Sequence, residues 1–137
     1  MIGLETNVLL RWLITGPSGD DESDRQIALV SKALGGSDET FFINHVVLAE
    51  TLWVLRNRAG QSKKLVGEIV DRLLHSSNVE VDRSEIVSAS RASFLAEPGD
   101  FTDHLIGQIN RSAGCRTTLT FDHKASKTRS LFTRLTR

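Results

Sequence analysis

The sequence predicts an α/β domain whose sheet is mostly parallel. Short apolar runs suited to buried strands alternate with longer segments in which apolar residues recur every three or four positions, as on one face of a helix. This alternation is typical of parallel sheets, because two parallel strands need a crossover connection between them. The 137 residues are enough for one sizeable core and contain no linker-like segment, so we expect a single domain over residues 1–137.

The chain opens with a short apolar strand at residues 2–4, followed at once by a polar turn into a helix. Thr6 or Asn7 can cap this helix, because a side-chain oxygen at the N-cap accepts a backbone N–H, and Glu5 either caps the helix or belongs to a site. The helix is expected to run to about Ile14, and Gly16-Pro17-Ser18-Gly19 then breaks the chain.

The remaining elements continue the alternation. Asp82, with Glu85 three residues later, has the form of a capping box for a helix that runs to about Leu95. The other expected helices lie at 27–34, 45–59, 62–74 and 101–112, with a basic helix from about His123. The other expected strands lie at 41–43, 79–81, 117–121 and 131–132.

The composition is that of an ordinary soluble domain, with 39% hydrophobic and 25% charged residues. The formal net charge is zero, which excludes the uniformly basic field of proteins that coat DNA. The charge is unevenly distributed, because residues 111–137 contain seven basic residues and one acidic residue. This stretch is therefore either a solvated surface or a phosphate-binding one.

Cys115 is the only cysteine, so no disulfide can form within the chain, and we expect a buried, inert thiol. Glu5 and Arg11 interrupt the apolar start, which argues against a signal peptide. No apolar stretch approaches the roughly 20 residues of a transmembrane helix. We therefore expect a cytoplasmic protein with no membrane partner.

Two acidic residues directly follow predicted strands. Glu5 comes after the first strand and Asp122 after the sequence TLTF. An isolated carboxylate at the end of a buried strand is costly unless it is paired. In open parallel sheets, binding sites gather beyond the carboxyl ends of the strands, so both residues are candidate site residues.

Glu50 lies on a predicted helix with apolar neighbours three and four residues away in both directions, and Asp103 shares a face of its predicted helix with Ile106. Both are therefore expected on inward faces. Taken alone, Glu50 is better explained as a structural partner for an arginine. Asp100 can cap the second of these helices, whereas Asp103 lies inside it with no capping role. Gly107 removes bulk beside Asp103, as the close approach of another element would require.

We expect the four carboxylates to converge on one cleft. Crowded like charges raise one another's pKa values unless a cation neutralises them. Carboxylates without cysteine or histidine partners are suited to Mg²⁺ or Mn²⁺ rather than Zn²⁺. Such a site favours hydrolysis of a phosphodiester, because the ion binds phosphate oxygens and activates water.

Three motifs carry a resemblance to a known family: LETNVLLRWL, VVLAETLWVL and DFTDHLIGQINRSAGCRTTLTFDHKA. In this order the chain resembles a PIN domain, specifically a VapC-type toxin ribonuclease of a bacterial toxin–antitoxin pair. The resemblance covers essentially the whole chain. It implies a three-layer α/β/α domain with a mostly parallel central sheet, a Mg²⁺ or Mn²⁺ centre, an RNA substrate, a cognate antitoxin, and homodimers and toxin–antitoxin hetero-oligomers.

The resemblance also implies residue roles. Catalytic and metal-binding roles are carried over to Glu5, Glu50, Asp103 and Asp122. Supporting or substrate-side roles are carried over to Thr6, Asn7, Asp100 and Thr120, and charge adds Lys124 and Lys127 as candidate phosphate contacts.

One position departs from the family pattern, in which the first motif reads Asp-Thr-Asn. Glu5 keeps the charge but adds a methylene, which moves the carboxylate by about 1.5 Å. Octahedral Mg²⁺ tolerates such a displacement poorly. One alternative is therefore an attenuated or inactive PIN-fold module that binds RNA or a partner. A separate alternative is a metal-free ribonuclease that uses histidines as acid and base, but nothing in the sequence places two histidines across one phosphate.

Overall fold

The structure is a computed structural model that describes residues 1–14 and 19–136, so residues 16–18 of the predicted break lie outside the described residues. The described residues form six α-helices, five strands and one 3-10 helix. In chain order these are β1 (Ile2–Gly3), α1 (Thr6–Leu13), α2 (Asp21–Leu34), β2 (Phe41–Ile43), α3 (His45–Asn57), α4 (Lys63–His75), β3 (Val79–Val81), α5 (Ser84–Ala96), α6 (Phe101–Ser112), β4 (Thr118–Thr120), η1 (Ala125–Lys127) and β5 (Phe132–Arg134).

Side-chain caps explain where several helices begin. Asn44 accepts the N–H of Val47 at 2.8 Å at the start of α3, and Ser62 begins α4 in the same way. Helix α1 is capped by Glu5, whose Oε1 accepts the N–H of Val8 at 3.1 Å, and not by Thr6 or Asn7 as predicted. The first acidic candidate is therefore also a helix cap.

Two local predictions are wrong. The capping box at Asp82 does not form, because Arg83 turns the chain through a left-handed conformation (φ 43°) and becomes the N-cap of α5 without a side-chain bond. Glu85 instead accepts a bond from Arg83 Nε at 3.2 Å. The basic helix expected from His123 is a single 3-10 turn, η1.

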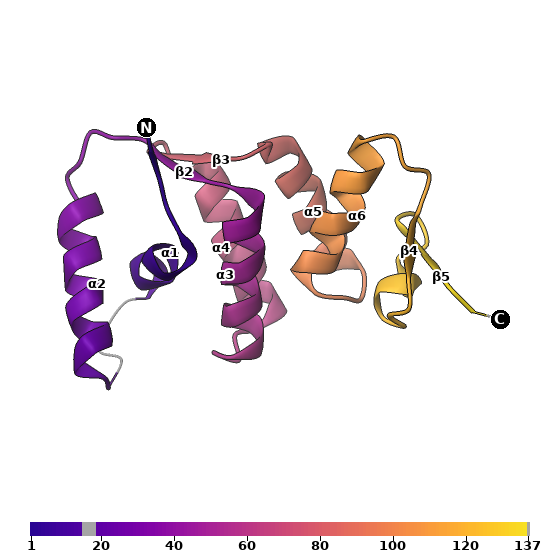
Figure 1. Cartoon of the computed structure of the whole chain (residues 1–137), viewed down its shortest axis with the longest axis horizontal. Helices are drawn as coiled ribbons and strands as arrows, with labels where there is room; N and C mark the ends of the chain where they lie inside the picture. The colour runs from indigo at the N-terminus through magenta and orange to yellow at the C-terminus, as the bar shows by residue number, and fades with distance from the viewer. Residues whose placement is uncertain (15–18, 137) are drawn as a thin grey trace.

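All strand pairs are parallel, as predicted, but the sheet is in two pieces. Strands β1, β2 and β3 form one sheet in that order, and β4 and β5 form a second. Within the described residues, no pairing joins β1 to β4. Figure 1 shows the β4–β5 pair at the far end of the molecule from the three-stranded sheet, with α5 and α6 between them.

Helix α6 holds the two pieces together. Its Phe101 and Leu105 belong to the main core, which also contains side chains of β2 and the buried face of α3. Its opposite face packs on β5 through Gly107, where an added Cβ would lie only 3.0 Å from both Leu131 and Phe132. The predicted close approach at Gly107 is therefore confirmed, and the element that approaches is the β4–β5 unit.

The prediction of a buried Cys115 is wrong, because its side chain is exposed. Cys115 follows the end of α6 in a turn where Gly114 adopts φ 98°, which carries the chain out over the surface. No described helix is long and apolar enough to cross a membrane.

Candidate active site

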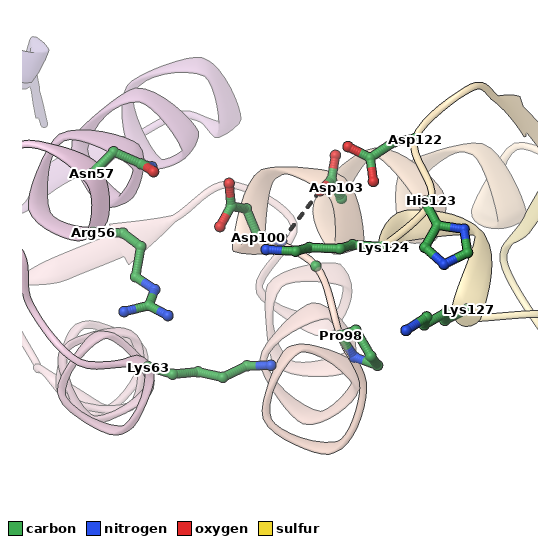
Figure 2. A pocket seen from close by; sticks show the side chains of 11 residues that line it. Arg56, Asn57, Lys63, Pro98, Asp100, Asp103, Asp122, His123, Lys124 and Lys127 are labelled. Carbon is green, nitrogen blue, oxygen red and sulfur yellow. Dashed lines mark hydrogen bonds between the residues drawn. The ribbon is translucent and has the colours of Figure 1, made fainter.

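Asp100, Asp103 and Asp122 line a cleft of about 710 Å³, which we call the aspartate cleft. Asp100 and Asp103 come from the start of α6, and Asp122 comes from the loop after β4. Figure 2 shows the three carboxylates on one side of this cleft. Two of the four predicted catalytic residues, Asp103 and Asp122, are thus brought together with the supporting residue Asp100.

The start of α6 fixes Asp103. Its Oδ2 accepts the backbone N–H of Asp100 at 3.2 Å, shown as the dashed line in Figure 2. The prediction that Asp103 has no capping role is therefore wrong. Just before the helix, Gly99 adopts φ 106°, a conformation that only glycine reaches without strain, and this turn forms part of the cleft wall.

The loop after β4 fixes Asp122 through two hydrogen bonds. Asp122 Oδ1 accepts the N–H of Ala125 at 2.9 Å, and the Asp122 N–H donates to Thr120 Oγ1 at 2.9 Å. Thr120, a predicted supporting residue, thus contacts Asp122 at the end of its strand. Asp122 is exposed, whereas Ala125 is buried in the small cluster behind the loop.

Burial makes ionised Asp103 unfavourable. Partial burial is the largest cause that raises the pKa of Asp103, and the charges of Asp122 and Asp100 raise it further. The sequence predicted that crowding would raise the pKa of at least one carboxylate. One pKa is raised, but desolvation contributes more than the neighbouring charges.

Basic side chains surround the aspartates. Of the described residues, Arg56, Lys63, Lys124 and Lys127 line the aspartate cleft, and Figure 2 shows them around its rim. Lys63 donates to the backbone oxygen of Glu97 at 2.7 Å, and burial lowers its pKa. Carboxylates within a ring of cations suit a substrate whose phosphates bind the rim while one of them reaches the acidic centre.

Sequence reasoning found Lys124 and Lys127 but missed Arg56 and Lys63. The two lysines share a segment with Asp122, whereas Arg56 and Lys63 come from α3 and α4. Their contribution depends on how these helices pack against the start of α6, and no short-range pattern in the sequence signals it.

His104 supports the same turn from behind the cleft. Its side chain is 1% exposed. Nε2 lies 2.9 Å from the Pro98 carbonyl oxygen, which can only accept, and Nδ1 lies 2.9 Å from Ser93 Oγ. Burial lowers the pKa of His104, so the neutral ring donates to Pro98 and braces the turn that carries Asp100 and Asp103.

Glu5 and Glu50 line a different cleft of about 530 Å³, which we call the glutamate cleft. The buried Thr6 hydroxyl donates to Glu50 Oε1, joining α1 to α3. Glu50 is exposed and does not face the core as predicted, since its side of α3 faces the open cleft. Asn7 lines the same cleft.

The structure therefore divides the four predicted acids into two pairs. In residues 1–14 and 19–136, no three His, Cys, Asp or Glu side chains lie close enough to hold one metal ion. The carboxylates are the ligand type that Mg²⁺ or Mn²⁺ prefers, and Mg²⁺ is usually held by one or two carboxylates together with waters and substrate phosphates, so the pair Asp103 and Asp122 fits such an ion. The division into two pairs has a topological reason, because Glu5 follows β1, Asp122 follows β4, and these strands are not neighbours in the described residues.

The comparisons with known proteins identify the family. The PIN domain sequence profile matches residues 2–131, a range that contains every predicted site residue. The chain belongs to the PIN domain family. No curated protein matches it significantly. A crystal structure of Mycobacterium tuberculosis VapC20, described as a toxin that cleaves the sarcin–ricin loop, is similar over 93% of this chain and 95% of that chain, with 16% sequence identity and a TM-score of 0.44.

Proposed function

We propose that this PIN domain is an endoribonuclease that acts as the toxin of a toxin–antitoxin pair. The observation that carries the proposal is the aspartate cleft, in which the family's third and fourth acidic positions, Asp103 and Asp122, lie within a ring of basic side chains. The three ordered motifs of the VapC type support the toxin assignment.

Within the cleft, the chain's own groups bind and orient the RNA backbone. The side chains of Lys124 and Lys127 hold phosphates on one wall, and those of Arg56 and Lys63 hold phosphates on the other. Such contacts set the position of the strand and carry little sequence information. The aspartates supply hard oxygen ligands, so we expect the activity to depend on Mg²⁺ or Mn²⁺.

The partner that follows from this proposal is a cognate antitoxin, and the compartment is the cytoplasm, where RNA and antitoxin are both available. A small reading frame beside this one, encoding a DNA-binding start and an apolar tail, would support the assignment. Co-expression of its product should form a complex with this chain and abolish cleavage.

Cleavage of RNA by the purified protein tests the proposal. We expect cleavage with Mg²⁺ or Mn²⁺ and none in EDTA, and Asp103→Asn should lower the rate by at least about a hundredfold. Asp38→Asn is the matched control, because it makes the same change at an exposed position outside both clefts. Cleavage that persists in EDTA would contradict metal dependence and favour the histidine alternative.

A second candidate is an inactive PIN-fold module that binds RNA or a partner. It is favoured by the separation of the acids into two pairs and by glutamate at the first acidic position. The same assay separates the candidates. RNA that binds to the wild-type protein and remains intact with either metal would support the module and contradict the nuclease.

A further inference from the structure

The turn that precedes α6, residues 97–100, is held by side chains from two different helices, and we call it the Pro98 turn. Lys63, at the start of α4, donates from Nζ to the Glu97 carbonyl oxygen at 2.7 Å. His104 Nε2 lies 2.9 Å from the next carbonyl oxygen, that of Pro98. Within the described part of the chain, neither carbonyl accepts a bond from a backbone N–H. The position of the turn therefore depends on these two side chains.

Phe94 contacts both of these side chains. Its ring is 1% exposed, and the Lys63 ammonium lies 4.8 Å from the ring centroid, where the face of the ring attracts a cation. His104 and Phe101 make T-shaped contacts with the same ring, at centroid distances of 6.2 Å and 5.7 Å. Because Phe94 and Phe101 belong to the main core, the Lys63 ammonium is fixed against that core.

Lys63 differs in this respect from the other cations of the aspartate cleft. Its side chain is partly buried, whereas the other cations among the described lining residues are exposed: Arg56, Lys124 and Lys127. Arg56 Nη1 donates to the Gln61 carbonyl oxygen at 2.9 Å, which ties it to the loop between α3 and α4 and not to the Pro98 turn. Lys63 is therefore the cation that joins the cleft to this turn.

The Lys63 ammonium can bind a second group. It has three N–H donors, and the Glu97 carbonyl takes one of them. Lys63 lines the aspartate cleft, and Figure 2 shows its side chain extending from α4 toward Pro98. The Pro98 turn ends at Asp100, whose N–H donates to Asp103 Oδ2 at 3.2 Å. One ammonium group can therefore hold a phosphate oxygen in the cleft and the segment that carries both aspartates.

We propose that Lys63 is a positioning residue, which holds an RNA phosphate and the Pro98 turn at a fixed offset from each other. The part that concerns RNA rests on the proposed function, whereas the hold on the turn does not. A misplacement of about 1 Å at a reacting centre can cost about a hundredfold in rate. Lys63 limits such misplacement, because its contacts with the turn and with Phe94 are already made in the free protein.

Cleavage kinetics distinguish this role from simple phosphate binding. Lys63→Met keeps an apolar stem against Phe94 and removes the ammonium, so kcat should fall by about thirtyfold while KM rises less than about threefold. Arg56→Met is the matched comparison on the same wall of the cleft, and it should raise KM by about fivefold with kcat within about twofold. Rates are divided by the RNA-binding stoichiometry, so that unfolded protein is not counted as slow enzyme.

The conservative variant completes the kinetic test. Lys63→Arg keeps a charged donor for the Glu97 carbonyl, so it should restore most of the lost kcat. Two results would overturn the proposal. One is a rise in KM for Lys63→Met with kcat unchanged, as for Arg56→Met, and the other is a Lys63→Arg variant as slow as Lys63→Met.

Hydrogen exchange tests the hold on the turn in the free protein, without RNA, metal or activity. The Asp100 amide reports it directly, because this N–H bonds to Asp103 across the start of α6. It should exchange at least about threefold faster in Lys63→Met than in the wild type, and at nearly the wild-type rate in Lys63→Arg. The Val47 amide, which donates to the Asn44 side chain at the start of α3, is the control and should not change.

The exchange result separates the two proposals. Equal exchange of the Asp100 amide in Lys63→Met and the wild type, or equally fast exchange in both Lys63 variants, would overturn the positioning role. If the wild type fails to cleave RNA but the Asp100 amide responds as expected, the proposed function fails and the hold of Lys63 on the Pro98 turn stands.

Discussion

The aspartate cleft and the glutamate cleft differ in how closely the protein surrounds their carboxylates. Asp103 is half-buried beside the His104-braced turn, and four basic side chains of the described residues face its cleft. Glu5 and Glu50 are exposed, and the bonds they accept, from Val8 N–H and the Thr6 hydroxyl, serve helix α1 and its packing on α3.

This difference indicates that the two clefts contribute differently to the proposed activity. The aspartate cleft is lined by a half-buried carboxylate and four basic side chains, whereas both carboxylates of the glutamate cleft are exposed. The effects of substitutions should therefore be larger around the aspartate cleft.

The largest structural effect is expected at Gly107. Gly107→Ala places a Cβ 3.0 Å from Leu131 and Phe132, which pushes the β4–β5 unit from α6 and moves Asp122. Overpacking should lower the free energy of unfolding by about 1–3 kcal/mol and reduce cleavage. Gly67→Ala is the control, because it has the same helix preference but meets only the flexible end of Leu95. Denaturant titrations measure both variants. If both were more stable than the wild type, β5 would shift to accept the added Cβ at no cost, which would contradict the prediction.

The lysines of the aspartate cleft provide the next comparison. Changing Lys124 and Lys127 together to Gln should weaken RNA binding more than tenfold and reduce the salt slope by about 1.4, since each single-strand phosphate contact adds about 0.7. Arg58→Gln in the glutamate cleft and Lys32→Gln on α2 should leave the slope nearly unchanged. Titrations over a range of salt concentrations measure this. If Arg58→Gln lowered the RNA affinity more than the double lysine variant does, the glutamate cleft would be the main RNA-binding site.

The local features of the fold were predictable because short-range rules determine them. Alternating strands and helices follow from apolar spacing, and the approach at Gly107 follows from one missing side chain. The capping box predicted at Asp82 requires Asp82 to be the N-cap of α5. Arg83 adopts a left-handed conformation and is the N-cap instead, so the helix begins one residue later.

The arrangement of the site was not predictable by the same rules. The sequence identified the acids by their positions at strand ends and on helices, but their grouping depends on which strands pair. Strand pairing is a long-range property, and the sequence pattern of β4 is compatible with β5, β1 or both. The burial of His104 was missed for the same reason, because its partners Ser93 and Pro98 lie outside its own helix.

A smaller effect is expected from Glu5, which caps α1 and lies at the first acidic position of the family. Glu5→Asp should raise metal-dependent cleavage by about tenfold, or roughly 1.4 kcal/mol, by re-seating one ligand. Aspartate is also a preferred N-cap, so the thermal stability should be kept or improved. Glu5→Gln should lower cleavage. If neither variant changes the cleavage rate, Glu5 acts only as a helix cap.

The smallest effect concerns pH and the folded state of Asp103. Burial raises its pKa, so the fold binds this proton more tightly than the unfolded chain does. That stabilisation is complete below about pH 4 and is lost as the pH rises through the folded-state pKa. At pH 7.5 without divalent ions, Asp103→Asn should therefore melt a little above the wild type, and the gap should narrow toward pH 4. Millimolar Mg²⁺ should raise the wild-type melting temperature at pH 7.5 and leave the variant unchanged. A variant that melts below the wild type at pH 7.5 would show that the bond from Asp100 N–H outweighs the cost of burying the charge.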